Sequence, residues 1–160
     1  LPGSLSEIVA DVNRQLCLDV RESGAFMTLF YLAVDSTRRS LRWVRAGHDP
    51  AIFFDPGAGT FEELAGTGAP LGFDEDVAFE EQEKAGVQRG QIVFIGTDGI
   101  WETIDAQGRM FGKQRVHDII RRHHGLSARQ MVQTVIAALQ EFRQELKAAD
   151  DITMVVVKIV

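Results

Sequence analysis

Apolar residues recur at helical spacing in two segments of the chain. In the first, Ser4 and Glu7 form a capping-box pattern, which predicts a helix from Leu5 to about Asp19 with one buried face. In the second, Ser127 opens another capping-box pattern, and an apolar stripe follows it: Met131, Val135, Ile136, Leu139, Phe142 and Leu146. Core packing accounts for this stripe better than a cofactor site does.

Elsewhere the apolar pattern is typical of β-strands. Apolar, aromatic and β-branched residues make up 26–34 and 41–46, which predicts an antiparallel hairpin. Segments 51–54 and 60–64 flank a turn rich in Pro and Gly and predict a second hairpin. The remaining predicted elements are a loop at 65–76, a polar strand near 77–84, an apolar strand at 91–95 and a last strand at 152–160. The last strand is β-branched on both faces, which predicts that it is covered on both sides.

Composition narrows the class of protein. The 160 residues match one domain, with 45% hydrophobic and 25% charged residues, and the net charge is −6 without any run rich in Lys or Arg. These values argue against nucleic-acid and anionic-membrane partners. No apolar stretch approaches the roughly 18 residues of a membrane span. One cysteine excludes an internal disulfide. We expect a soluble, cytoplasmic chain, and because it opens at Leu1 rather than a methionine, a piece of a longer protein.

An acidic residue stands three positions after the apolar strand at 91–95. Asp98 stands between Thr97 and Gly99, where a carboxylate is held by the strand and the glycine lets other groups approach closely. Such a residue is well placed to hold a cation. The alternative is that Asp98 simply begins a turn, and taken alone the motif favours this alternative.

A pair of adjacent carboxylates, Asp150 and Asp151, stands at the start of the last predicted strand. If this strand runs antiparallel beside 91–97, Asp98 and Asp150 meet at one sheet edge. Gathered carboxylates repel each other unless a divalent cation neutralises them, and oxygen ligands suit Mg²⁺ or Mn²⁺ better than zinc. The alternative is a pair of solvated aspartates that cap a strand.

Other polar residues allow a functional and a structural interpretation. His48, between two predicted strands, is either a general acid or ligand, or a ring that hydrogen-bonds a turn, which we favour. Arginines on the first hairpin can attract a phosphate, although a solvated hairpin is the preferred interpretation: Arg38, Arg39, Arg42 and Arg45. We assign the helical histidines to a solvated surface: His117, His123 and His124.

An ordered set of short motifs spans the chain. They are Phe26-Met27-Thr28-Leu29, Ala46-Gly47-His48-Asp49-Pro50, Pro70-Leu71-Gly72, Thr97-Asp98-Gly99-Ile100-Trp101-Glu102, Phe111-Gly112 and Asp150-Asp151-Ile152-Thr153. In this order they resemble the SpoIIE-like branch of the metal-dependent (PPM, type 2C) serine/threonine phosphatases. The resemblance implies an α+β fold, an α-β-β-α sandwich of antiparallel sheets flanked by helices. It also implies two Mn²⁺ or Mg²⁺ ions at one sheet edge and a bridging water that attacks phosphoserine or phosphothreonine.

The resemblance also assigns roles to individual residues. Asp98 and Asp150 match metal-ligand aspartates and are the expected catalytic residues, and Asp151 is a fallback ligand beside them. Supporting positions are Gly47 and His48, which shape a turn near the site, together with Gly99 and Glu102. The implied substrate is a phosphorylated regulatory protein of the anti-sigma-factor-antagonist type, in bacterial sigma-factor or related signalling.

The chain departs from the family pattern at its beginning. The family starts with an acidic strand and a Gly-Asp-Val-x-Gly-His-Gly segment whose aspartate bridges both metals, and neither stands in these 160 residues. We therefore expect residues 1–160 to be a single phosphatase domain that is N-terminally truncated to its C-terminal two-thirds or so. A partial metal site, weak cation affinity and little turnover follow. Open sheet edges would then favour self-association, for example as a homodimer.

Two other functions compete with the phosphatase. A regulatory or interaction module of the same fold would bind a partner without catalysis. A different Mg²⁺-dependent phosphotransfer enzyme would also bind its metal through clustered carboxylates, but the ordered motif set argues against this function.

Overall fold

The computed structural model describes residues 4–146 and 150–160 of the chain. These residues form two compact units, which are described separately. The first comprises the described residues up to Pro50 together with Leu64–Val87, and the second comprises Ala51–Glu63 and Gln88–Val160. No helix in the described ranges is long and apolar enough to cross a membrane.

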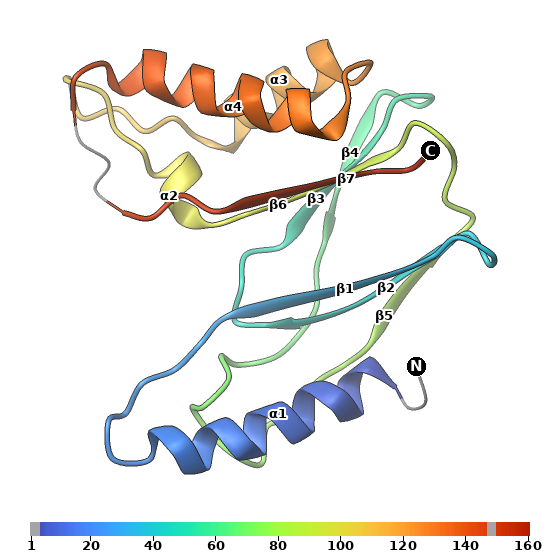
Figure 1. Ribbon diagram of the computed structural model, residues 1–160, viewed down its shortest axis with the longest axis vertical. Coiled ribbons are helices and arrows are strands. Elements are labelled where there is room, and N and C mark those ends of the chain that lie inside the picture. Colours follow the sequence, from blue (N-terminus) through green and yellow to red (C-terminus); the bar gives the residue numbers. More distant parts are fainter. Residues whose placement is uncertain (1–3, 147–149) are drawn as a thin grey trace. The chain divides into compact units, whose positions relative to one another are not determined.

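The first unit packs one helix on a three-stranded antiparallel sheet (Figure 1). Its elements are α1 (Leu5–Val20), β1 (Leu29–Asp35), β2 (Ser40–Ala46) and β5 (Gln82–Ala85), with strand order β1-β2-β5. Both predicted features are confirmed: the capping box at the start of α1 and the β1–β2 hairpin. The apolar face of α1 meets the sheet and the following loop in one core, formed by Leu5, Val9, Val44, Ala46, Leu71 and Phe79.

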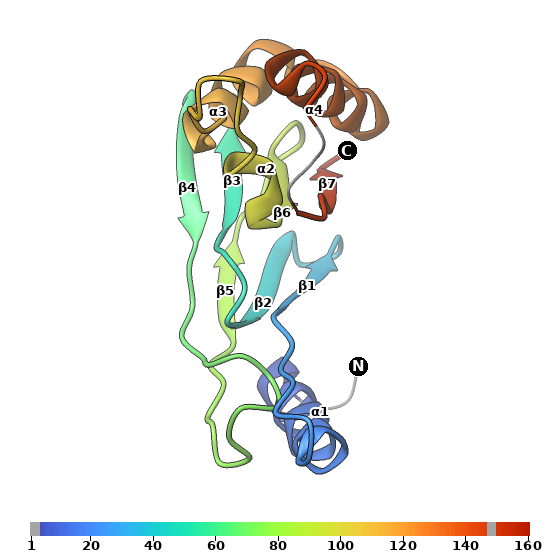
Figure 2. The ribbon, with the colours of Figure 1, turned by 90° about the vertical axis from the view of Figure 1, so that its left-hand side faces the viewer.

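The second unit is a four-stranded antiparallel sheet with helices on it (Figure 2). Its strands are β3 (Ala51–Asp55), β4 (Thr60–Leu64), β6 (Ile92–Gly96) and β7 (Met154–Lys158), in the order β4-β3-β6-β7. Its helices are α2 (Asp98–Trp101), α3 (Lys113–His123) and α4 (Ala128–Arg143). The predicted stripe of α4 is mostly core, because Met131, Val135 and Leu139 are buried with strand residues such as Phe94. The capping box at Ser127 is also confirmed.

Three expectations differ from the structure. β7 ends the strand order and its Val155 is 49% exposed, so the prediction of a strand covered on both sides is wrong. The alternative of a turn at Asp98, which the motif favours when taken alone, is not what forms, because Asp98 begins the short helix α2. His117 is not a solvated surface residue, because its ring stacks on Phe61 with centroids 4.2 Å apart. β-Branched residues suit the strand itself, but the neighbours of the strand determine how far they are buried.

Burial lowers the pKa of the His117 imidazole, because the charged form loses solvation. The cation of Arg121 on the next turn of α3 acts in the same direction. The other charged groups that affect it are Lys113, which lowers the pKa, and Glu63 and Asp118, which raise it. The net result favours the neutral ring.

Candidate functional site

The pairing of β6 with β7 brings the predicted carboxylates to one end of the sheet. β7 runs antiparallel beside β6, with Gly96 opposite Met154, as the sequence analysis assumed. The chain leaves β6 and enters α2 at Asp98, while Asp150 and Asp151 lie just before β7 (Figure 1). The end of one strand therefore adjoins the start of the other, and all three aspartates are exposed there.

Thr97 links these two chain segments. Its backbone N–H donates to the carbonyl of Thr153 (3.1 Å), and its Oγ1 accepts from the N–H of Thr153 (3.1 Å). The Thr97 hydroxyl also lies 3.3 Å from the carbonyl oxygen of Asp151, to which it can donate. These bonds hold the segment before β7 against the first residues of α2. Thr97 lies one residue beyond Gly96, where the β6–β7 register ends.

Gly99 allows this close approach. A Cβ at this position would lie 2.4 Å from the carbonyl oxygen of Asp151 and 3.6 Å from Ile152 Cγ1. The first distance is far below an ordinary contact, and the atom it meets is backbone. Glycine is therefore required here by backbone packing, which gives this supporting position a physical reason.

The carboxylates make local hydrogen bonds. Asp98 Oδ1 accepts from the Gly99 N–H (2.9 Å), and Asp150 Oδ1 accepts from the Asp151 N–H (2.7 Å). Glu102, at the end of α2, is exposed, and its backbone N–H donates to the carbonyl of Asp98 (2.8 Å). Its side chain acquires no role from these contacts.

The donor chemistry suits a hard divalent cation, but the number of donors is small. Carboxylate oxygens are the ligands of Mg²⁺ and Mn²⁺, and Mg²⁺ is often held by one or two carboxylates with water and phosphate completing the shell. Among residues 4–146 and 150–160, no group of three or more His, Cys, Asp or Glu side chains is placed to hold a metal ion. The described aspartates thus supply the type of ligand that Mg²⁺ or Mn²⁺ prefers, but they are too few to complete the coordination of the ion.

Gly47 and His48 lie in the first unit, whereas the aspartates lie in the second. Gly47 has a φ of +68°, and a Cβ there would lie 2.6 Å from Pro70 Cγ. Its N–H donates to the carbonyl of Gly68 (3.2 Å). This glycine therefore joins the turn after β2 to the loop at 65–76.

The His48 ring takes part in the same turn. Its Nδ1 lies 2.8 Å from the carbonyl oxygen of Asp49, and the ring meets Phe30 edge-on at 6.2 Å. Arg45 donates to the His48 carbonyl (2.8 Å). The hydrogen-bonded turn, which the sequence favoured for this residue, matches these contacts.

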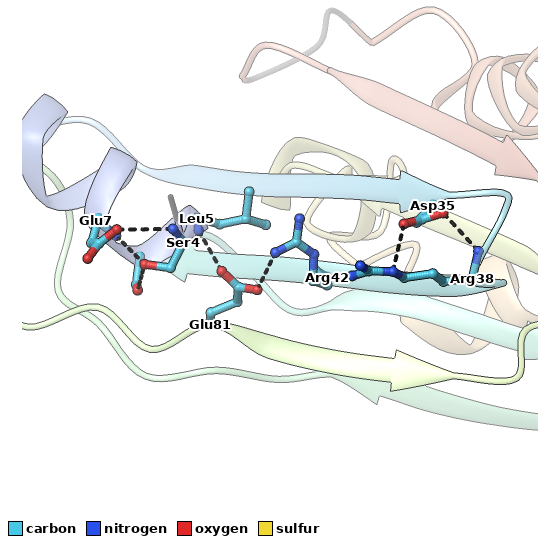
Figure 3. Close-up of polar contacts among 8 residues, drawn as sticks. Ser4, Leu5, Glu7, Asp35, Arg38, Arg42 and Glu81 are labelled. Carbon is cyan, nitrogen blue, oxygen red and sulfur yellow. Dashed lines mark hydrogen bonds and ion pairs between the residues drawn. The ribbon is translucent and has the colours of Figure 1, made fainter. Parts of the chain in front are cut away.

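The arginines of the first hairpin have structural partners. Arg42 forms an ion pair with Glu81 (2.9 Å), whose other oxygen accepts from the Leu5 N–H (Figure 3). Arg38 lies beside Asp35 in the turn, where the hydrogen bond from its backbone N–H lowers the pKa of the Asp35 carboxyl (Figure 3). These contacts support the hairpin interpretation over a phosphate site.

Sequence reasoning missed Thr97 and Thr153 as parts of this site. Nothing in the pattern marks a threonine beside an aspartate as the partner of a second threonine 56 residues later in the chain. The position of Thr97 two residues after the predicted strand at 91–95 is the one signal available. The atoms that hydrogen-bond to the Thr97 hydroxyl are brought to it by the pairing of β6 with β7, which the sequence does not specify.

Comparisons with known proteins agree with one another. The family model of Stage II sporulation protein E (SpoIIE) matches residues 2–160. Phosphoserine phosphatase RsbU of Bacillus subtilis (strain 168) is 24% identical over 153 residues, which are 96% of this chain and 44% of RsbU. Phosphoserine phosphatase RsbP of the same organism is 25% identical over 138 residues, 86% of this chain and 32% of RsbP. The chain thus spans less than half the length of these relatives.

Solved structures share the fold. The SiaA-PP2C domain of Pseudomonas aeruginosa superposes with a TM-score of 0.84 at 21% identity, covering 97% of this chain and 61% of that one. The phosphatase domain of SpoIIE from Bacillus subtilis (Mn presoaked) gives 0.59 at 19% identity, covering 99% and 68%. The expected α+β class of antiparallel sheets with helices is confirmed, and it matches PP2C-like phosphatase domains.

Proposed function

The chain belongs to the SpoIIE family, and from this premise we propose that it forms part of the catalytic domain of a metal-dependent serine/threonine protein phosphatase. The observation that carries the proposal is the joining of the Asp98 and Asp150-Asp151 segments at one end of the β6–β7 pair by Thr97. RsbU and RsbP, which are both named phosphoserine phosphatases, support the same reaction.

We assign Asp98 and Asp150 as ligands of Mn²⁺ or Mg²⁺, with Asp151 as the fallback ligand. When bound, such ions supply a nucleophilic water near neutral pH and neutralise charge on the phosphoryl group. The chain's own contribution is to fix its carboxylates: Thr97 fastens the segment before β7, and Gly99 lets that segment approach α2. Gly47 and His48 shape a turn of the domain. Glu102 is a supporting position only because it matches the family motif.

The expected ligand set is larger than the one in this chain. The family's bridging aspartate has no counterpart in the 160 residues, and the described residues offer no cluster of three donors. We therefore propose that residues 1–160 act as one portion of a phosphatase domain that needs further ligands for two ions. In isolation this portion would bind cations weakly and turn over slowly.

The proposed substrate is a phosphorylated regulatory protein of the anti-sigma-factor-antagonist type, in a bacterial sigma-factor pathway located in the cytoplasm. β7 is an edge strand among the strands of residues 4–146 and 150–160, and this edge and the exposed Val155 also support association into a homodimer. A non-catalytic binding module of the same fold is the second candidate, and the small number of described metal donors favours it.

The experiment that tests the site measures Mn²⁺ binding by calorimetry and Mn²⁺-dependent hydrolysis of p-nitrophenyl phosphate. Asp98→Asn and Asp150→Asn should each weaken Mn²⁺ binding at least tenfold, because each removes a charged ligand. Asp11→Asn is the matched control, since Asp11 is an exposed aspartate of α1. Unchanged Mn²⁺ affinity in both site variants would exclude the ligand assignment.

Activity distinguishes the two candidate functions. A version extended upstream to include the family's bridging aspartate should hydrolyse the ester, and its Asp98→Asn variant should not. If the extended protein binds Mn²⁺ and stays inactive, the binding module is the better description.

A further inference from the structure

The first unit presents two exposed aromatic side chains beside an apolar groove. Phe26 is 64% exposed and Phe73 is 75% exposed. Both line a groove of about 380 Å³ whose other lining residues are Gly24, Ala69 and Pro70. Single exposed apolar residues are common on proteins, but two phenylalanines at one concave site mark a surface suited to a partner.

The loop that carries Phe73 is held in place by a buried side chain. Asn13 of α1 is fully buried; its Nδ2 donates to the carbonyl of Asp74 (2.8 Å) and its Oδ1 accepts from the N–H of Gly72 (2.9 Å). These bonds fasten the backbone on both sides of Phe73. The side chain is therefore presented from a fixed backbone, which lowers the entropy cost of binding.

The other wall is fixed to the same loop. Met27 and Leu71 exchange two backbone hydrogen bonds, of 2.9 and 2.8 Å. Gly72 has a φ of +85°, and a Cβ there would lie 3.2 Å from the carbonyl oxygen of Ala25. The segments that carry Phe26 and Phe73 are thus joined next to both aromatic residues, so the groove is preformed.

The chain segments that adjoin Phe73 and Phe26 in sequence are mostly acidic. Phe73 is followed directly by three exposed acidic residues, Asp74, Glu75 and Asp76. The last turn of α1 adds Asp19, and the turn after it adds Glu22 and one opposing charge, Arg21, all in sequence within seven residues of Phe26. Five carboxylates against one guanidinium favour a cationic partner and repel an anionic one.

We propose that this groove docks a segment of a partner protein that carries a bulky apolar side chain next to Lys or Arg. The apolar side chain would pack between Phe26 and Phe73, where aromatic contacts supply most of the affinity. The flanking cations would face the acidic loop. Every lining residue belongs to the first unit and none is among Asp98, Asp150 and Asp151, so the proposal does not depend on the phosphatase assignment.

The test is a titration of the ¹⁵N-labelled chain, followed by amide chemical shifts, with two synthetic peptides. One peptide has two leucines between pairs of lysines, and the other has glutamates in place of the lysines. The lysine peptide should shift amides in 24–27 and 69–76 with a submillimolar dissociation constant. Phe73→Ala should weaken this binding at least tenfold, and 0.5 M NaCl should also weaken it.

Met110→Ala is the matched control, because Met110 is 60% exposed and lies outside the groove. It should bind the lysine peptide as the unmodified chain does. Equal binding of the glutamate peptide, shifts confined to other residues, or no binding at millimolar peptide would overturn the proposal. So would a dimer of the chain that Phe73→Ala dissociates in sedimentation, since a second copy would then be the occupant.

Discussion

Replacing Gly99 by alanine tests whether backbone packing shapes the carboxylate site. The added Cβ would lie 2.4 Å from the Asp151 carbonyl oxygen, about 1 Å inside an ordinary contact. Neither atom belongs to a flexible side chain, so the segment before β7 must move away from α2. Overpacking of this kind costs roughly 1–3 kcal/mol. For a chain of this size each kcal/mol lowers Tm by about 2–4 °C.

Scanning calorimetry and Mn²⁺ titration together make the assay. Gly99→Ala should lower Tm by several degrees and weaken Mn²⁺ binding, because the Asp150-Asp151 segment shifts relative to Asp98. Gly125→Ala is the matched control: a Cβ there meets nothing within 4 Å, and its backbone is not in the left-handed region. If both variants melt at the same temperature, the close approach at Gly99 is not a constraint. A lower Tm with unchanged Mn²⁺ affinity would refute the link between this contact and the site.

Three further predictions rest on single contacts. Thr97→Val should weaken Mn²⁺ binding while Thr97→Ser retains it, because the hydroxyl bonds to the segment before β7; equal affinities would remove its positioning role. Burial against Phe61 lowers the pKa of His117, so the unfolded chain binds the proton first and the free energy of unfolding falls as pH drops through about 6.5. His117→Phe should flatten this slope in thermal melts from pH 8 to 5.5, and an unchanged slope would contradict the assignment. Ser127→Ala should cost about 1 kcal/mol in urea unfolding by removing the cap of α4, whereas a loss below 0.3 kcal/mol would mean that the capping box is not stabilising.

Local signals in the sequence determined much of the fold. Both capping boxes begin helices where the Ser residues predict them, because a cap satisfies N–H groups within three residues of itself. Both hairpins form around their turn residues for a similar local reason. The order of short motifs also identified the family, since each motif is a contiguous run of the chain.

Only the tertiary structure decided the contacts that join distant segments. The requirement for glycine at position 99 depends on the Asp151 carbonyl, which strand pairing brings to it. The role of Asn13 also depends on a distant segment. The sequence around Asn13 in α1 does not indicate that its side chain is fully buried and hydrogen-bonds the loop around Phe73. The β-branched sequence of β7 predicts a strand covered on both sides, but its actual exposure depends on which elements lie beside it. Periodicity records which side of an element is apolar, whereas burial and close approach depend on partners that are remote in sequence.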